Sequence, residues 1–203
     1  MKLFDTHAAP NPRRVRMFLA EKGIELETCP VDIGGGENRR PEFLAMNPLG
    51  KVPVLELDDG RHVAESLAIC EYFEELHPEP SLIGADAVER AMIRMWERRM
   101  ELEVMRWLLG AFINSSEFFK HRVKQVPAFA EVCRELLAER LTWLDGELAA
   151  RDYVAGERFS IADITLFCTL DFGNMVGEQY DVDVFPAVAR WHRRVAARPS
   201  AAA

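Results

Sequence analysis

Residues 47–66, NPLGKVPVLELDDGRHVAES, decide which fold the chain adopts. The apolar runs at 52–57 and 61–64 predict two strands, because the Asp-Asp-Gly sequence at 58–60 is typical of a hairpin turn. A proline cannot donate to a strand ladder, so Pro53 is expected at the first position or the edge of its strand. X-Pro bonds are also the only ones with a realistic cis population. A cis bond after Val52 would leave its amide and carbonyl exposed, as one donor and one acceptor for a peptide-like ligand.

A helix is expected over 66–76, directly after this stretch. Its apolar face is formed by Leu67, Ile69, Cys70, Phe73 and Leu76. Glu65 and Ser66 therefore lie at the helix N-terminus, where free backbone amides favour an anion. Together with Val52, these residues predict a site for a small peptide that carries a carboxylate.

The ordered set of motifs at 47–53, 58–60 and 65–69 resembles the glutathione-binding half of the cytosolic glutathione transferase family. The resemblance extends over essentially the whole chain and is to a bacterial member of the theta or nu type. It implies an α/β thioredoxin-like N-terminal domain followed by an all-α C-terminal helical domain. It also implies glutathione as co-substrate, a small hydrophobic electrophile as second substrate, and a homodimer in which helix 66–76 and the first long helix face the partner.

Composition narrows the class of protein. The chain has 203 residues, 49% of them hydrophobic, a net charge of −8 and a pI near 5.2. This charge argues against nucleic acid or an anionic membrane as the main partner, because phosphate contact needs clustered Lys and Arg. An acid already at position 5 and the lack of an apolar run of roughly 18 residues predict a soluble cytoplasmic protein.

Cysteine and histidine spacing predicts no metal site. The four cysteines are widely separated, without a Cys-x-x-Cys pair, and are expected to be buried free thiols. They are Cys29, Cys70, Cys133 and Cys168. The five histidines show no ligand spacing either.

The first half of the chain alternates strands and helices. Residues 2–7 predict a strand, and a helix is expected to follow with Asn11 as N-cap, Pro12 at its first position and Gly23 at its end. Residues 26–33 predict a second strand, and a short helix begins at Pro41. With the elements at 52–76, this order predicts a mixed sheet covered by helices, a glutathione-binding domain over 1–77.

The second half predicts only helices. The sequence His-Pro-Glu-Pro at 77–80 breaks the pattern, so a domain boundary is expected at 77–86. Helical periodicity follows at 87–117, 125–149 and 185–197, so 87–203 is expected to form an all-α domain that lines the acceptor-substrate site. Ser160 and Asp163 predict a helix capping box, a structural feature of the corresponding core helix in the family.

Thiol chemistry needs a hydrogen-bond donor beside the sulfur, because the thiolate is the nucleophile and a free thiol is mostly protonated at neutral pH. Lowering the thiol pKa by two units requires about 2.7 kcal/mol. In the family, the turn after the first strand usually presents Tyr, Ser or Cys, whereas the matching position here is Ala9, which has no side-chain donor. Asn11 is the best catalytic candidate; Thr6, His7 and the backbone amides at 10–13 are alternatives.

The resemblance also implies roles for binding residues. Val52, before Pro53, would pair with the cysteinyl backbone of glutathione, and Glu65 and Ser66 with its γ-glutamyl amine and carboxylate. Candidates for the glycyl end or for electrostatic support near the sulfur are Lys51, Arg39 or Arg40, Asn38 and Arg13. Candidates for the wall that faces the acceptor substrate are Met100, Glu103, Arg106, Trp107, Phe172 and Met175.

Three functions are compatible with this pattern. The first is a glutathione transferase that attacks a small electrophile with the bound thiolate. A close variant reduces peroxides or mixed disulfides, which tolerates the loss of the usual hydroxyl better. The third is a non-catalytic module that binds glutathione or a protein partner, which remains open because fold alone does not settle function.

Overall fold

The computed structural model describes residues 1–203 and divides into two compact units, Met1–Leu82 together with Pro199–Ala203, and Ile83–Arg198. Residues 199–203, expected in the helical half, belong to the first unit because this segment packs against one of its helices. The functional roles of 1–77 and 87–203 stay a prediction.

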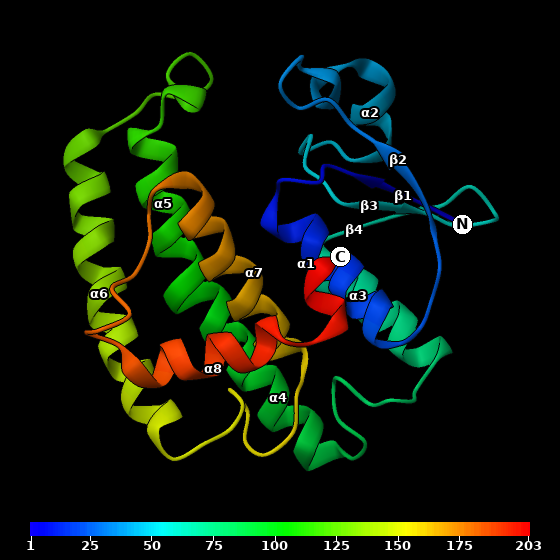
Figure 1. The fold of residues 1–203 in the computed structure, drawn as a ribbon. Coiled ribbons are helices and arrows are strands. Elements are labelled where there is room, and N and C mark those ends of the chain that lie inside the picture. Colours follow the sequence, from blue (N-terminus) through cyan, green and yellow to red (C-terminus); the bar gives the residue numbers. More distant parts are fainter. The chain divides into compact units, whose positions relative to one another are not determined.

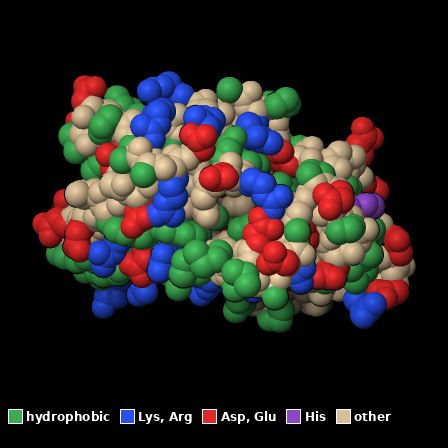
Figure 2. All heavy atoms as spheres, turned by 90° about the horizontal axis from the view of Figure 1, so that it is seen from below, with side chains coloured by type: hydrophobic (Ala, Val, Ile, Leu, Met, Phe, Trp, Pro, Cys, Tyr) green, Lys and Arg blue, Asp and Glu red, His purple; other side chains and the backbone are tan.

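No helix is long and apolar enough to span a membrane. Figure 2 shows acidic and basic side chains interspersed on one face of the molecule.

The first unit is built on a four-stranded mixed sheet of order β2-β1-β3-β4 (Figure 1). Its strands are β1 (Lys2–Asp5), β2 (Glu27–Pro30), β3 (Val54–Glu56) and β4 (His62–Ala64). β1 and β2 are parallel, whereas β1 and β3, and β3 and β4, are antiparallel. This sheet with its helices confirms the thioredoxin-like fold predicted for this half.

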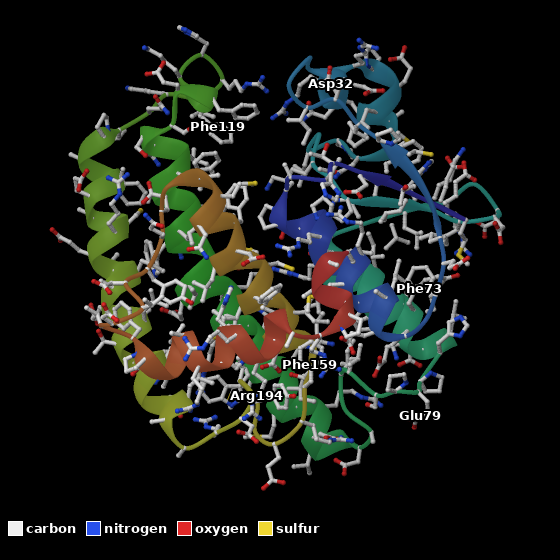
Figure 3. The ribbon with its side chains drawn as sticks, viewed as in Figure 1. Asp32, Phe73, Glu79, Phe119, Phe159 and Arg194 are labelled. Carbon is white, nitrogen blue, oxygen red and sulfur yellow. The ribbon has the colours of Figure 1, made fainter.

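Helices cover both faces of the sheet (Figure 1). They are α1 (Pro10–Glu21), η1 (Glu37–Arg39), α2 (Pro41–Met46), α3 (Ser66–Leu76) and the short η4 (Pro199–Ala202). On one face, Phe43 of α2 packs on Val31 and Val54. On the other, α1 and α3 pack together, with Phe18 and with Phe73 (labelled in Figure 3) fully buried. Strand residues alternate between these two layers, as the pleat requires.

Element ends in this unit differ from the sequence-based prediction. The strand expected at 2–7 ends at Asp5, because the chain turns when the Ala9 amide donates to the Thr6 carbonyl at 3.1 Å. The helix then begins at Pro10 with Ala9 as N-cap, so the prediction of Asn11 as N-cap is wrong. Proline is accepted there because the first-turn amides have no partner within a helix.

The second unit contains only helices, as predicted. They are α4 (Ala87–Arg99), η2 (Met100–Met105), α5 (Arg106–Ser115), η3 (Glu117–Phe119), α6 (Pro127–Ala149), α7 (Ile161–Val176) and α8 (Pro186–Ala196). The single helix expected at 87–117 is interrupted by η2, which has π-helical hydrogen bonding. α7 is the central helix of the unit, since residues 161–170 are all buried, and it packs against α4, η2 and α8.

The predicted capping box at the start of α7 is confirmed, and its acid joins more than one helix. The carboxylate of Asp163 accepts hydrogen bonds from the Ser160 amide at 3.0 Å and from the Val154 amide and the Trp191 indole, both at 2.8 Å. Burial raises the pKa of Asp163 to about 6. These bonds connect the loop before α7 to α8.

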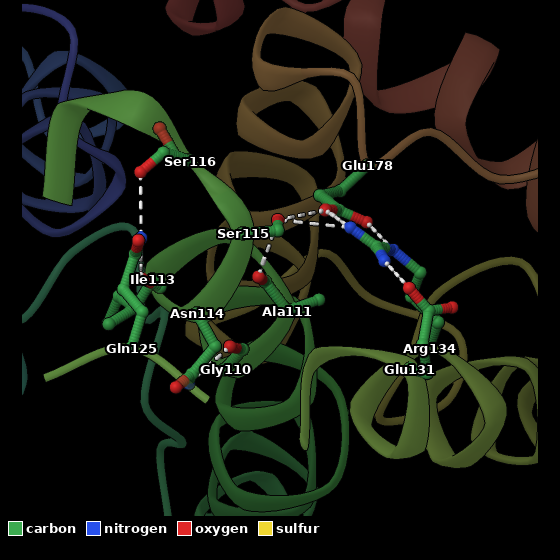
Figure 4. A network of polar contacts seen from close by, with 10 residues as sticks. All are labelled: Gly110, Ala111, Ile113, Asn114, Ser115, Ser116, Gln125, Glu131, Arg134 and Glu178. Atoms are coloured by element: carbon green, nitrogen blue, oxygen red, sulfur yellow. Dashed lines mark hydrogen bonds and ion pairs between the residues drawn. The ribbon is translucent and has the colours of Figure 1, made fainter. Parts of the chain in front are cut away.

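A second polar network fixes the far end of this unit (Figure 4). The Arg134 guanidinium of α6 donates to both carboxylate oxygens of Glu178, at 2.9 and 2.6 Å, and to the Ser115 hydroxyl of α5 at 3.0 Å. Gln125 donates to the carbonyls of Ile113 and Ser116, at 2.9 and 2.8 Å. The network ties the loop after α7 to the ends of α5 and α6.

Candidate active site

Three segments of the first unit converge at the edge of the sheet where β1 and β4 end and β3 begins. Val54 pairs with Phe4 of β1 and with Ala64 of β4. The residues just before β3, just after β4 and just after β1 therefore lie at the same edge. These residues are Val52 and Pro53, Glu65 and Ser66, and the turn that leads into α1. The structure thus brings the turn before α1 together with two segments that follow it by more than 40 residues in sequence.

Val52 presents free backbone groups at this edge. The Val52–Pro53 peptide bond is cis, and the ladder with β1 begins only at Val54. No hydrogen bond within the chain uses the Val52 amide or carbonyl. One donor and one acceptor are therefore available to an extended ligand, in agreement with the prediction from the sequence.

Two buried asparagines hold the loop before Val52. The Asn47 side chain donates to the Lys51 carbonyl at 2.9 Å and accepts from the Leu49 amide at 3.2 Å. The Asn38 amide donates to the Gly50 carbonyl at 2.7 Å. Asn38 is only 6% exposed and supports the loop through this bond, while its expected contact with the glycyl end of a ligand stays a prediction. The role of Asn47 was missed, although its place before a proline indicated a turn.

The N-terminus of α3 is arranged to bind an anion. Ser66 is the first helical residue and Glu65 the N-cap, so Ser66 is not itself the cap. The Ile69 amide donates to the Glu65 carbonyl at 3.0 Å, which leaves the three preceding amides of the helix without a partner. The Ser66 hydroxyl makes no hydrogen bond within the chain either. These donors converge at the positive end of an 11-residue helix, where a carboxylate is stabilised.

Glu65 has an unusual backbone conformation. It is the only non-glycine residue of the chain with positive φ, at φ 71° and ψ 116°. L-residues avoid this region, and such strain concentrates at ligand-binding positions. The side chain is exposed and caps no backbone amide, so its carboxylate is available to a cation such as a ligand ammonium group. Nothing in the sequence signals this conformation.

The first turn of α1 offers few donors. Residues 10 and 12 are prolines and lack an amide hydrogen, and the Arg13 amide donates to the Ala9 carbonyl at 3.3 Å. Among residues 10–13, only Asn11 keeps a free amide. Its half-buried side chain also makes no hydrogen bond within the chain. The two donors of Asn11 are therefore the ones that this turn directs outward.

The other candidates near this turn are used elsewhere or exposed. The Thr6 hydroxyl donates to the Val31 carbonyl, and the exposed His7 accepts through its own carbonyl from Arg16 at 2.9 Å. The Arg13 guanidinium donates to the Ala201 carbonyl at 2.8 Å. Arg13 therefore holds the segment after α8. Its expected electrostatic support of a ligand stays a prediction.

Positive charges border the loop at 47–53. Lys51 and Arg40 are exposed and make no side-chain hydrogen bond or ion pair within the chain, whereas the Arg39 guanidinium lies 3.4 Å from the Leu49 carbonyl. Exposed cations of this kind suit a carboxylate at the edge of a site.

In the second unit, the predicted acceptor wall is only partly accessible. Met100 is fully buried, so its expected place in the wall is corrected to the core of the unit. Glu103 accepts from Arg140 at 2.8 Å. Arg106 is exposed and its guanidinium lies 4.8 Å from the centre of the Trp107 ring.

An aromatic cluster lies where α5 and α7 meet. The Phe172 ring packs edge-on against Phe112 at 5.2 Å, and Phe112 packs on Phe119 at 5.4 Å (Phe119 is labelled in Figure 3). Met175, one turn beyond Phe172, is 58% exposed. Phe112 and Phe119 were missed by the sequence analysis, although the aromatic run in FINSSEFF was the available signal.

Comparisons with known proteins agree with this geometry. Residues 8–76 match the model of the glutathione S-transferase N-terminal domain, and residues 104–199 match that of the C-terminal domain. The chain is 37% identical to glutathione S-transferase 2 of Saccharomyces cerevisiae over 98% of its length and 87% of that protein. It is 27% identical to the disulfide-bond oxidoreductase YfcG of Escherichia coli, covering 98% of this chain and 92% of that one. A glutathione S-transferase domain-containing protein of Marinobacter aquaeolei superposes with a TM-score of 0.92 at 39% identity, covering 98% and 99% of the two chains.

Proposed function

Because the chain belongs to the glutathione S-transferase family, we propose that it is a glutathione transferase in which the thiolate of bound glutathione attacks a small electrophile. The observation that carries the proposal is the pair of unpartnered backbone groups of Val52 beside the free N-terminus of α3. Glutathione is a peptide with a carboxylate at each end, and these groups are complementary to it.

Each part of glutathione has a partner in this proposal. Val52 pairs with the cysteinyl amide and carbonyl, as an added strand pairs with a sheet edge. The amides at the start of α3 and the Ser66 hydroxyl bind the γ-glutamyl carboxylate, while Glu65 binds the amine of the same residue. Lys51 and Arg40 bind the glycyl carboxylate.

Asn11 stabilises the thiolate. Its backbone amide and side-chain amide together supply two hydrogen bonds, each worth about 1.5 kcal/mol when the acceptor is charged. Two such bonds provide about the 2.7 kcal/mol that a two-unit fall in the thiol pKa requires. The absence of a hydroxyl at Ala9 is compatible with an enzyme if Asn11 takes this role.

The electrophile is expected to be small and apolar or aromatic. The aromatic cluster at Phe172, together with Trp107 and the exposed Met175, offers the kind of surface that binds such a molecule. The exposed Arg106 supplies a positive charge for an electron-withdrawing substituent.

A glutathione-dependent reduction of peroxides or mixed disulfides is the second candidate function. Two observations favour it: the missing hydroxyl at Ala9 and the similarity to the disulfide-bond oxidoreductase of Escherichia coli. Disulfide exchange also depends on a thiolate nucleophile, so the same Asn11 donors would serve it. A module that binds glutathione without activating it is the third candidate.

We further propose a cytoplasmic homodimer. Val88, Met92 and Leu102 leave 74, 46 and 41% of their surface exposed along α4 and η2 of the second unit. In the first unit, Leu76 of α3 leaves 50% of its surface exposed. Exposed large apolar side chains are typical of a protein interface. A sedimentation mass near 23.1 kDa at micromolar concentration would contradict the dimer.

The test of the proposed function is a pH titration of the ultraviolet absorbance of the glutathione thiolate in excess protein. The wild type is expected to lower the thiol pKa by about two units, and Asn11→Ala to remove at least half of this effect. Binding without a shifted thiol pKa would favour the non-catalytic module, and no binding at all would refute the site. Turnover with an aryl halide against turnover with a mixed disulfide then separates transferase from reductase.

A further inference from the structure

The segment after α8 returns to the first unit and packs along α1. The chain enters the helical unit after Leu82 and leaves it after Arg198, and η4 then lies against α1. Ser200 is only 5% exposed, which is low for a hydroxyl in a four-residue helix. This contact is between parts of the chain nearly 190 residues apart.

Two hydrogen bonds join this segment to opposite ends of α1. The Arg13 guanidinium, in the first turn, donates to the Ala201 carbonyl at 2.8 Å. The Ser200 hydroxyl donates to the Glu21 carboxylate, in the last turn. Arg13 and Glu21 are eight residues apart, which is about 12 Å along the helix axis. Contacts this far apart restrain both the rotation and the tilt of a helix.

Asn11 lies on the other side of the same helix. It precedes Arg13 by two residues, a rotation of about 200° around the axis. A side-chain tip about 6 Å from the axis moves by about 1 Å when the helix rotates by about 10°. A hydrogen bond weakens steeply over such a change in length and angle. Restraint of α1 is therefore restraint of the two Asn11 donors.

We propose that Ser200 and the carbonyl of Ala201 are positioning groups for the glutathione thiolate, which hold α1 through Glu21 and Arg13 so that Asn11 points at the sulfur. The proposal rests on the proposed function, since it needs a thiolate that Asn11 stabilises. Ser200 and Ala201 of η4 would then help to position the thiolate without any contact with the substrate.

Ser200→Ala is the main test, because it removes one of the two bonds and leaves the charges near the sulfur unchanged. The pKa of the bound glutathione thiol is expected to rise by about half a unit, a threefold loss of thiolate at fixed pH. The dissociation constant of glutathione, measured well below the thiol pKa, should stay within twofold because Val52, Glu65 and Ser66 lie outside α1. Arg13→Lys, which keeps the charge and changes the geometry, is expected to shift the thiol pKa in the same direction.

One control variant and one double variant separate positioning from general stability. Ala202→Ser changes an exposed position of the same segment and should have no effect. In the Asn11→Ala background, only the backbone amide of residue 11 remains as a donor, so Ser200→Ala should change the thiol pKa by at most half as much as in the wild type.

Three results would overturn the proposal. The first is a wild-type thiol pKa in folded Ser200→Ala and Arg13→Lys, with folding checked by circular dichroism and melting temperature. The second is an equal shift in the presence and absence of Asn11. The third is a wild-type protein that does not lower the thiol pKa at all, which would refute the proposed function as well, whereas the first two leave that function standing.

Discussion

Replacement of Glu65 by glycine should make the protein more stable and at the same time weaken its binding of glutathione. Glu65 is the only non-glycine residue with positive φ, and its ψ of 116° lies outside the region that L-residues tolerate. Its side chain caps no backbone amide of α3, so its removal costs the helix no hydrogen bond. Strain and function are therefore separable at this one position.

The size of the effect follows from the backbone. A residue held in a sparsely populated φ/ψ region costs about 1–3 kcal/mol. Glycine removes this cost, but it also stabilises the unfolded chain by about 0.4–1 kcal/mol because it gives that chain more conformational entropy. Glu65→Gly should therefore raise the free energy of unfolding by about 1 kcal/mol. For a chain of this length, that corresponds to a melting temperature about 2–4 °C higher. Loss of the carboxylate should weaken glutathione binding about 10- to 100-fold.

Glu65→Ala is the matched control, because alanine loses the carboxylate but keeps the Cβ atom that causes the strain. Both variants should lose the same affinity in isothermal titration with glutathione, and only the glycine variant should gain stability in thermal and urea unfolding. Equal stability of the two variants would refute the strain. Retained affinity in either would show that Glu65 does not contact glutathione.

Three further outcomes are expected. Burial raises the pKa of Asp163 to about 6, so between about pH 4 and 6 the folded state holds a proton that the unfolded state has lost. The free energy of unfolding should therefore fall as the pH rises across this window, by about 3 kcal/mol relative to Asp163→Asn, and parallel pH profiles in urea unfolding would contradict this. Gly50→Ala, at φ +61° with its new Cβ 2.7 Å from the Asn38 carbonyl oxygen, should destabilise the protein by about 2 kcal/mol and weaken glutathione binding in the same titrations. Gly110→Ala, which places a Cβ 2.7 Å from the Cys133 sulfur, should lower the melting temperature, and adding Cys133→Ala should restore most of this loss. An unchanged melting temperature in Gly110→Ala would contradict the close contact.

Much of the fold could be predicted because the relevant signals are local. The helix at 66–76 was predicted with the bounds that the structure gives, since the apolar period and the turn before it specify both ends. Ser160 and Asp163 form the predicted capping box because the motif is complete within four residues. Element ends were less accurate where a turn hydrogen bond decides them, as with the bond from the Ala9 amide to the Thr6 carbonyl after Asp5.

The sequence indicated which residues lie together in the candidate site, but it did not indicate their backbone conformation. The motif around Val52 and the pair Glu65 and Ser66 indicated a peptide site, and the register of β3 with β4 places these residues at one edge of the sheet. The positive φ of Glu65 had no sequence signal, because it arises from the junction of a strand and a helix that tertiary packing fixes. The support that Asn38 gives to the loop at Gly50 also had no local signal, because the two residues are 12 positions apart.

The sequence by itself therefore determined the family, the order of the elements and the candidate residues for glutathione binding, because each of these depends on motifs and periodicities a few residues long. Only the tertiary structure decided which donors remain free at the start of α1, which expected wall residue is buried, and that residues 199–203 return to the first unit. The physical reason is that hydrogen-bond availability and burial depend on neighbours that are distant in the chain. The Thr6 hydroxyl, for example, is excluded as a donor because it is bound to the carbonyl of Val31, 25 residues away.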